Sequence, residues 1–287
     1  MPSLRKIIRR IKSVENTKQI TAAMKMVAAA KLQKAQKMIY STRNYADTLE
    51  DVLSQVVSRR SIISHPLLRE NKTNKKLLVA IAADRGLCGG FNTNLNKTAL
   101  KILTEKKEDE EYDLIVVGRK VRDFFRTRKI EYKKEYIGFF DRMTISHAEH
   151  ITNDLIDLYL TGEYKEIILL YNKFKSMLVQ EITQDIFLPI KKIELKETDN
   201  KVDFTYEGDE DEIIKMLLTE TLKLKIWKVL LESYSSEQAA RRTAMESATD
   251  NAEEMIKKLT ITKNKIRQAI ITTEITEIVG GAEALKG

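Results

Sequence analysis

Helix-breaking residues are almost absent from both ends of this 287-residue chain. Neither glycine nor proline occurs from Ser3 to His65 or from Asp209 to Val279. Both residues are costly in a helix interior, so their absence over such lengths permits two very long helices. The remaining glycines and prolines fall at the extreme termini or in the middle stretch. Compact enzymes rarely show this distribution, which indicates a rod made from both termini and attached to a globular centre.

Other absences narrow the class of protein further. Cys88 is the only cysteine, which excludes an intrachain disulfide and fits a reducing compartment. No run approaches eighteen consecutive apolar residues, so the sequence predicts no membrane-spanning helix. Aromatic residues make up 7% of the chain and charged residues 32%. This composition is typical of long exposed helices with one modest core, and it is too hydrophobic for a disordered chain.

The net charge of +8 is concentrated in the first arm. Residues 1–60 contain 13 Lys and Arg against 4 Asp and Glu, and the remainder is close to neutral. A basic rod predicts an acidic partner, such as nucleic acid, anionic lipid or acidic protein loops. The basic start also has features of a mitochondrial transit peptide. The helical pattern continues past it without a cleavage-like break, so we interpret it as part of the mature helix.

Both arms carry a stripe of apolar and small residues spaced alternately by three and four positions. The stripe runs from Leu32 to Val56 in the first arm and from Leu224 to Thr276 in the second. This spacing predicts a coiled coil. We expect the two arms to be its partners and to run antiparallel, because they are joined through the middle domain. The arms would be about 80 and 105 Å long, so the second should project beyond the first. We expect another protein to cover its apolar far end.

The middle of the chain has the alternation of an α/β domain. Short apolar runs predict strands at 77–84, 112–118 and 166–174, with helices at 92–107, 121–128 and 146–160 and a further strand within 179–190. The predicted fold class is therefore α/β, with a central Rossmann-like domain and a long antiparallel coiled coil. We expect a first helix over 1–65, the Rossmann-like domain over 75–195 and the second coiled-coil helix over 209–287.

No pattern in the chain specifies a catalytic, cofactor or metal site. The loop Asp84 to Asn92 follows a predicted strand, but its glycines match neither G-x-G-x-x-G nor G-x-x-x-x-G-K-[ST]. A tight turn with positive φ is favoured over phosphate binding there. His147 and His150 flank Glu149 at a predicted helix start, where three side chains cannot all face one metal. Cys88 is interpreted as a buried small residue rather than a nucleophile.

Four segments in order resemble the gamma subunit of F-type ATP synthases. They are SVENTKQITAAMKMVAAAKLQKAQ (13–36), DRGLCGG (84–90), SSEQAARRTAMESATDNAEEMI (235–256) and NKIRQAIITTEITEIVGGAEAL (264–285). The resemblance implies a bacterial-type rotor shaft inside a ring of three alpha and three beta subunits. The α/β domain would lie below, against the epsilon subunit and the c-ring. It implies that the chain has no catalytic site, no cofactor and no nucleic acid partner. It also implies that the chain lies peripherally at the cytoplasmic face of the bacterial plasma membrane.

The resemblance also assigns roles to particular residues. It implies beta-subunit contacts for a set of seven residues: Met24, Lys25, Asp84, Arg85, Arg241, Gln268 and Thr272. Asp84 to Gly90 is similar to the collar loop near the acidic lever of beta. Tyr206, Glu207 and Asp209 resemble a Tyr-Glu-Pro-Asp segment that faces the c-ring or epsilon, with Gly208 in place of the proline.

Two other classes of protein stay open on the residues alone. A basic coiled-coil adaptor would bind acidic proteins or nucleic acid, with an affinity that falls steeply with salt. Only Tyr40 supplies an aromatic ring for stacking in the first forty positions, which counts against nucleic acid. A nucleotide-using enzyme would need the phosphate-binding motif that the middle domain lacks.

Overall fold

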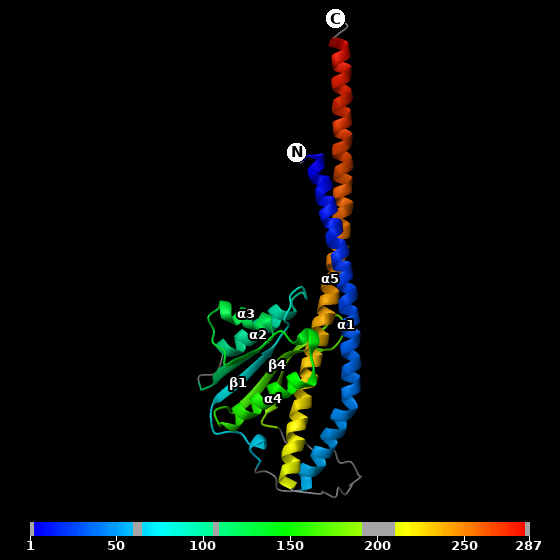
Figure 1. The fold of residues 1–287 in the computed structure, drawn as a ribbon. Coiled ribbons are helices and arrows are strands. Elements are labelled where there is room, and N and C mark those ends of the chain that lie inside the picture. The colour runs from blue at the N-terminus through cyan, green and yellow to red at the C-terminus, as the bar shows by residue number, and fades with distance from the viewer. Residues whose placement is uncertain (1–2, 60–64, 106–108, 191–209, 285–287) are drawn as a thin grey trace. The chain divides into compact units, whose positions relative to one another are not determined.

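The computed structural model describes residues 3–59, 65–105, 109–190 and 210–284 (Figure 1). These residues fall into two compact units, one made of Met1–Ala28 with Arg242–Gly287 and the other of Ala29–Arg241. Two long helices, α1 (Leu4–Arg59) and α5 (Glu210–Ala284), contribute residues to both units. We describe each unit by itself.

In the first unit, the beginning of α1 packs against α5 in the antiparallel direction. Three polar pairs cross between the helices: Lys18 Nζ to Glu253 Oε2 at 3.0 Å, Thr21 Oγ1 to Thr249 Oγ1 at 2.8 Å, and Lys25 Nζ to Glu246 Oε1 at 3.5 Å. Residue numbers rise by three and four along α1 while they fall by four and three along α5. This is the spacing at which side chains share one face of a helix. The predicted antiparallel pairing of the two arms is confirmed.

The second unit contains a five-stranded sheet in the order β3-β2-β1-β4-β5. The strands are β1 (Lys75–Ile81), β2 (Glu111–Val117), β3 (Lys134–Tyr136), β4 (Glu166–Phe174) and β5 (Gln180–Leu188). The first four are parallel and β5 is antiparallel to β4. The three expected strands and the further strand are all present. The first strand ends earlier than expected, and the three-residue β3 was not predicted because it is too short to show a period.

Helices cover both faces of this sheet. On one face, α2 (Phe91–Thr104) and α3 (Arg119–Thr127) bury Leu95, Ala99 and Phe125 against alternate residues of the strands. On the other face lie α4 (Ile145–Leu160) and the first part of α5 (Figure 1). Successive strand residues point to opposite faces, so a strand covered on both sides is apolar throughout. The doubly covered sheet confirms the predicted α/β class.

The C-terminal helix has a role that the sequence analysis did not predict. Its residues from Ile214 to Leu231 belong to the hydrophobic core of the sheet, where Trp227 is 5% exposed. A stripe with three- and four-residue spacing fits a sheet face as well as a partner helix, so the pattern alone does not separate the two. The helix also continues through Gly280 and Gly281 and ends at Ala284. Each glycine costs about 1 kcal/mol relative to alanine, which is a tolerable cost near a helix end.

Candidate functional site

The collar loop, Asp84 to Gly90, connects β1 to α2 and is held by its own side chains. Leu87 and Gly89 have φ angles of 63° and 58°, which confirms the tight turn with positive φ. Asn92 Oδ1 accepts a hydrogen bond from the main-chain N–H immediately before the loop at 3.0 Å. Its Nδ2 donates to the Arg85 carbonyl at 3.2 Å. The loop therefore presents a fixed backbone at the carboxyl end of the sheet.

Asp84 joins this loop to two neighbouring connections. Its Oδ1 accepts from the N–H of Arg119 at 3.0 Å and from the N–H of Gly138 at 2.9 Å. Its Oδ2 accepts from the N–H of Phe140 at 3.4 Å. A carboxylate that satisfies several main-chain donors fixes the segments that supply them. Asp84 thus ties together the chain after β1, β2 and β3.

Asp141 lies between two cations next to the collar loop. Its Oδ1 accepts from Lys31 Nζ of α1 at 2.7 Å, and its Oδ2 pairs with Arg85 at 2.7 Å. The hydrogen bond from Lys31 is the main reason that the pKa of Asp141 lies below its usual range, with Arg85 adding to it and partial burial opposing it. Neither Lys31 nor Asp141 was among the candidate residues. No sequence motif links these two positions.

Arg241 is buried beneath the collar loop rather than exposed. One of its terminal nitrogens pairs with Glu237 Oε1 at 2.6 Å and donates to the carbonyl of Gly86 at 3.1 Å. The two side chains are only 10% and 5% exposed. Burial raises the pKa of Glu237, and the attraction of Arg241 opposes that rise. Glu237 was also missed, although a Glu and an Arg four positions apart among small residues is a signal for such a buried pair.

The same stretch of α5 covers the position where related α/β folds hold a nucleotide. Ligands of open α/β sheets bind outside the carboxyl ends of the strands. Here Ala240 packs against Ala83, Cys88 and Phe91 at the end of β1. Burial also raises the pKa of the Cys88 thiol to about 11, in keeping with its interpretation as a buried small residue. The protein's own helix lies where a phosphate would need room.

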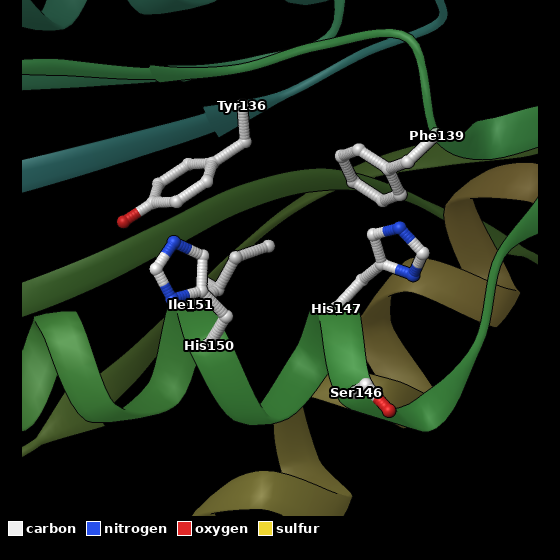
Figure 2. Close-up of a pocket in the computed structure, with 6 residues that line it drawn as sticks. All are labelled: Tyr136, Phe139, Ser146, His147, His150 and Ile151. Atoms are coloured by element: carbon white, nitrogen blue, oxygen red, sulfur yellow. The ribbon is translucent and has the colours of Figure 1, made fainter.

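A small cavity of about 150 Å³ lies between α4 and the chain around β3. Figure 2 shows Tyr136 and Phe139 on one side and the imidazoles of His147 and His150 on the other. His147 stacks on Phe139 with centroids 5.0 Å apart, and its Nδ1 accepts from the N–H of Thr144 at 3.2 Å. His150 meets the edge of Tyr136. Across the described residues, no three His, Cys, Asp or Glu side chains are grouped closely enough to hold a metal ion.

The candidate residues of the first unit lie at the helix pair and beyond it. Met24 is half-buried, and Lys25 pairs with Glu246 across the helices. Gln268 and Thr272 are exposed on α5, where the Thr272 hydroxyl donates to the Gln268 carbonyl at 2.9 Å. The same end of α5 exposes the following large apolar side chains: Ile270, Ile271, Ile275, Ile278 and Val279. The expected uncovered apolar end is present.

Three candidate residues, Tyr206, Glu207 and Asp209, lie outside the described residues. Within the described ranges, none of the helices has both the length and the apolar content needed to cross a membrane.

The structure brings some candidate residues together and separates others. Asp84, Arg85 and Arg241 meet at the collar loop, through Asp141 and Gly86. Met24, Lys25, Gln268 and Thr272 belong to the other unit. The candidates therefore form two groups rather than one pocket.

Comparisons with known proteins cover almost the entire chain. A family model described as ATP synthase matches residues 3–285. The ATP synthase gamma chain of Desulfitobacterium hafniense is 44% identical over 286 residues, with 100% of both chains covered. The gamma chain of Geobacter metallireducens is 43% identical over 288 residues, again with 100% of both covered.

Solved structures share the fold at lower identity. A chain from the central stalk and c-ring structure of the Tetrahymena thermophila mitochondrial ATP synthase has a TM-score of 0.61 and 23% identity, covering 80% of this chain and 99% of that one. A chain from the Euglena gracilis mitochondrial ATP synthase rotor has a TM-score of 0.63 and 17% identity, covering 93% and 98%. The full-length relatives and the family model together show that this chain belongs to the ATP synthase family and is one of its gamma chains, which are non-catalytic subunits.

Proposed function

We propose that this chain is the rotating shaft of a proton-translocating F-type ATP synthase. In this role it couples rotation of the c-ring to the conformational cycle of the catalytic sites on beta. The observation that carries the proposal is the full-length identity of 44% to a bacterial gamma chain. The antiparallel helix pair, with its exposed apolar end on α5, supports it.

The proposed partners are three alpha and three beta subunits, the epsilon subunit and the c-ring. The expected location is the cytoplasmic face of the bacterial plasma membrane, where the chain is held peripherally through the c-ring. The exposed isoleucines near the end of α5 favour a surrounding protein sleeve, since such a surface is poorly tolerated in water.

We propose a separate role for each of three parts of the chain. Residues 1–65 and 209–287 would form the coiled-coil shaft, and residues 75–195 the α/β domain that meets epsilon and the c-ring. Tyr206, Glu207 and Asp209 are proposed to face the c-ring or epsilon.

The proposed contacts with beta fall into two kinds. Met24, Lys25, Gln268 and Thr272 are proposed to touch beta along the shaft. At the collar, Arg85, whose side chain is 71% exposed, is proposed to contact the acidic lever of beta directly.

Asp84 and Arg241 would serve the collar contact by fixing the loop, because their polar atoms already bond to this chain. Exposed ion pairs are individually weak, so the collar would act through shape as much as charge.

The mechanism proposed for coupling is population shift. A shaft without rotational symmetry presents a different surface to each beta subunit at any one angle. Each surface favours one open or closed state of beta by its differential contacts. By linkage, binding or release of nucleotide on beta must then favour particular shaft angles to the same extent.

A tagged pulldown from native membranes tests the assembly. Recovery of one copy with three alpha and three beta subunits, and ATPase activity in the eluate, is the expected result. Recovery of nucleic acid without those subunits would favour a basic adaptor instead.

Truncation after Ile261 tests the coupling role, because it removes Gln268 and Thr272 but keeps the core residues up to Leu231. We expect assembly to persist and ATP-driven proton pumping to fall relative to ATP hydrolysis. Normal pumping per ATP in the truncated complex would contradict the proposed shaft contacts.

A further inference from the structure

The two helical layers of the sheet carry opposite charge. The segment Arg119–Lys129, which comprises α3 and the turn after it, contains six Lys or Arg and a single acid, Asp123. On the other face, α4 contains three acids and no Lys or Arg. The near-neutral composition of the middle domain therefore conceals one strongly basic surface.

Most of this positive charge is not neutralised within the unit. Arg122 pairs with Asp123 at 2.8 Å. Five others have no carboxylate within ion-pair distance in the part of the chain that the structure describes, and we call them the basic layer: Arg119, Lys120, Arg126, Arg128 and Lys129. Four of them are exposed, and Lys120 is half-buried. Unpaired cations gathered on one face raise the local potential and attract anionic groups.

The surroundings of the basic layer indicate which kind of anion it fits. None of the residues of α2, of α3 and of the turn after α3 carries a large, strongly exposed apolar side chain. Insertion into a lipid surface needs such side chains, and so does stacking on nucleic acid bases. Phe124 and Phe125 meet edge to face. The Arg128 guanidinium covers the ring of Phe124, 3.6 Å from the ring centroid. The layer is thus suited to charge pairing without apolar contact.

We propose that the basic layer is a docking surface for an acidic helical segment of a partner protein. Arg119 and Arg126 are seven residues apart on α3, about 10 Å along its axis. Carboxylates at positions i and i+7 of a partner helix have the same separation. A contact of this kind is reversible and depends on salt, because exposed pairs are screened. This inference goes beyond the proposed rotor function and does not depend on it.

A site-specific fluorescence titration of the full chain tests the proposal. Thr127 is exposed between Arg126 and Arg128, and Thr127→Cys can carry an environment-sensitive dye. Cys88 is 1% exposed, so the dye should react with the introduced thiol alone. Asn153→Cys on α4 is the matched control on the acidic side. The probe is a helical peptide of repeated glutamate and alanine residues at about 0.15 M salt.

We expect the dye at residue 127 to report saturable binding that weakens with salt, and the dye at residue 153 to report none. The variant Arg119→Gln, Lys120→Gln, Arg126→Gln, Lys129→Gln should bind about tenfold more weakly, since each exposed pair changes affinity by a small factor. The matched neutralisation of four α1 cations (Arg5, Lys6, Arg9 and Arg10, each to Gln) should leave the signal at residue 127 unchanged. Fluorescence of Trp227 checks that each variant retains the sheet core.

Three results would overturn the proposal. The first is no response at residue 127, and the second is an equal response at residue 153. The third is tighter binding at residue 127 by phosphatidylserine vesicles or duplex DNA than by the acidic peptide, which would assign the layer to a lipid or nucleic acid partner. None of these three results concerns assembly with alpha and beta. The docking proposal can therefore be refuted while the proposed rotor function stands, and the reverse is also true.

Discussion

Removal of the buried cation at the collar should destabilise the α/β unit strongly. The Glu237 carboxylate pairs with Arg241 at 2.6 Å, and both side chains are almost fully buried. The variant Arg241→Met keeps most of the side-chain length but leaves the carboxylate buried without a countercharge. Breaking a buried ion pair from one side costs about 3–5 kcal/mol. The variant Arg241→Met with Glu237→Gln should recover a large part of this loss, because no uncompensated charge remains.

The cost should depend on pH in a defined direction. Burial raises the pKa of Glu237 in the folded state, and Arg241 opposes this rise. Without Arg241 the pKa should rise further, so the folded variant binds a proton more readily than the unfolded chain. Its stability is then highest below the unfolded glutamate pKa of about 4.3 and falls as pH rises through the folded value. The destabilisation should be greatest at neutral pH and should shrink as the solution is acidified. The double variant should lose this dependence.

Urea unfolding followed by the fluorescence of Trp227 measures the free energy of unfolding of the structural unit that contains Glu237 and Arg241. Trp227 is the only tryptophan and lies in the sheet core. Urea is uncharged, so it does not screen the pair under study. A loss smaller than about 1 kcal/mol would place the pair among surface salt bridges and refute the reasoning. An equal loss at acidic and neutral pH would show that Glu237 is not the source of the cost.

Three further predictions concern the same unit. Native Cys88 should react far more slowly with a maleimide than it does in urea, because burial raises its pKa to about 11; equal rates would contradict that burial. Gly118→Ala should destabilise by more than about 2 kcal/mol, since φ is 101° and a Cβ would collide with the carbonyl of Ala82. Gly162→Ala, with φ of 81° and open space around it, is the matched control and should cost only about 1 kcal/mol. Urea titrations of both variants provide the comparison. Asp141→Asn should cost a few tenths of a kcal/mol at neutral pH, because this carboxylate is 40% exposed. Its two cations lower its pKa, so the stabilisation is present above the unfolded pKa of about 3.9 and is lost as pH falls through the lower folded value. A difference that persists at pH well below both values, or that is unaffected by salt, would argue against the ion cluster.

The spacing of apolar residues and the distribution of glycine and proline predicted most of the fold. The two long helices follow from the missing glycines and prolines, and the strands around Val79, Ile115 and Leu169 follow from short apolar runs. The antiparallel direction followed from the joining of both arms through the middle domain. The double use of α5 was beyond this approach, because Leu218 and Leu222 read the same whether they face a helix or a sheet.

The candidate residues show where motif reasoning stops. Arg85 and Arg241 were both selected from sequence segments, but only the structure separates an exposed cation from a buried one. Asp141 could not have been found, because its partner Lys31 is 110 positions away. Electrostatic clusters assembled from distant elements leave no local spacing in the sequence. The basic layer on α3 was missed for another reason, since net charge averaged over a domain hides its distribution.

The participation of α5 in the sheet core also governs how the protein is made. Strands β1 to β5 are complete at Leu188, yet one face of the sheet needs Ile214 to Leu231 to cover it. A ribosome adding about 5–20 residues per second takes roughly two to nine seconds to travel between Leu188 and Leu231. During that interval α4 alone covers this face, and the strand residues that later pack against α5 are left exposed. Its biosynthesis therefore includes a period in which part of that face is open to aggregation.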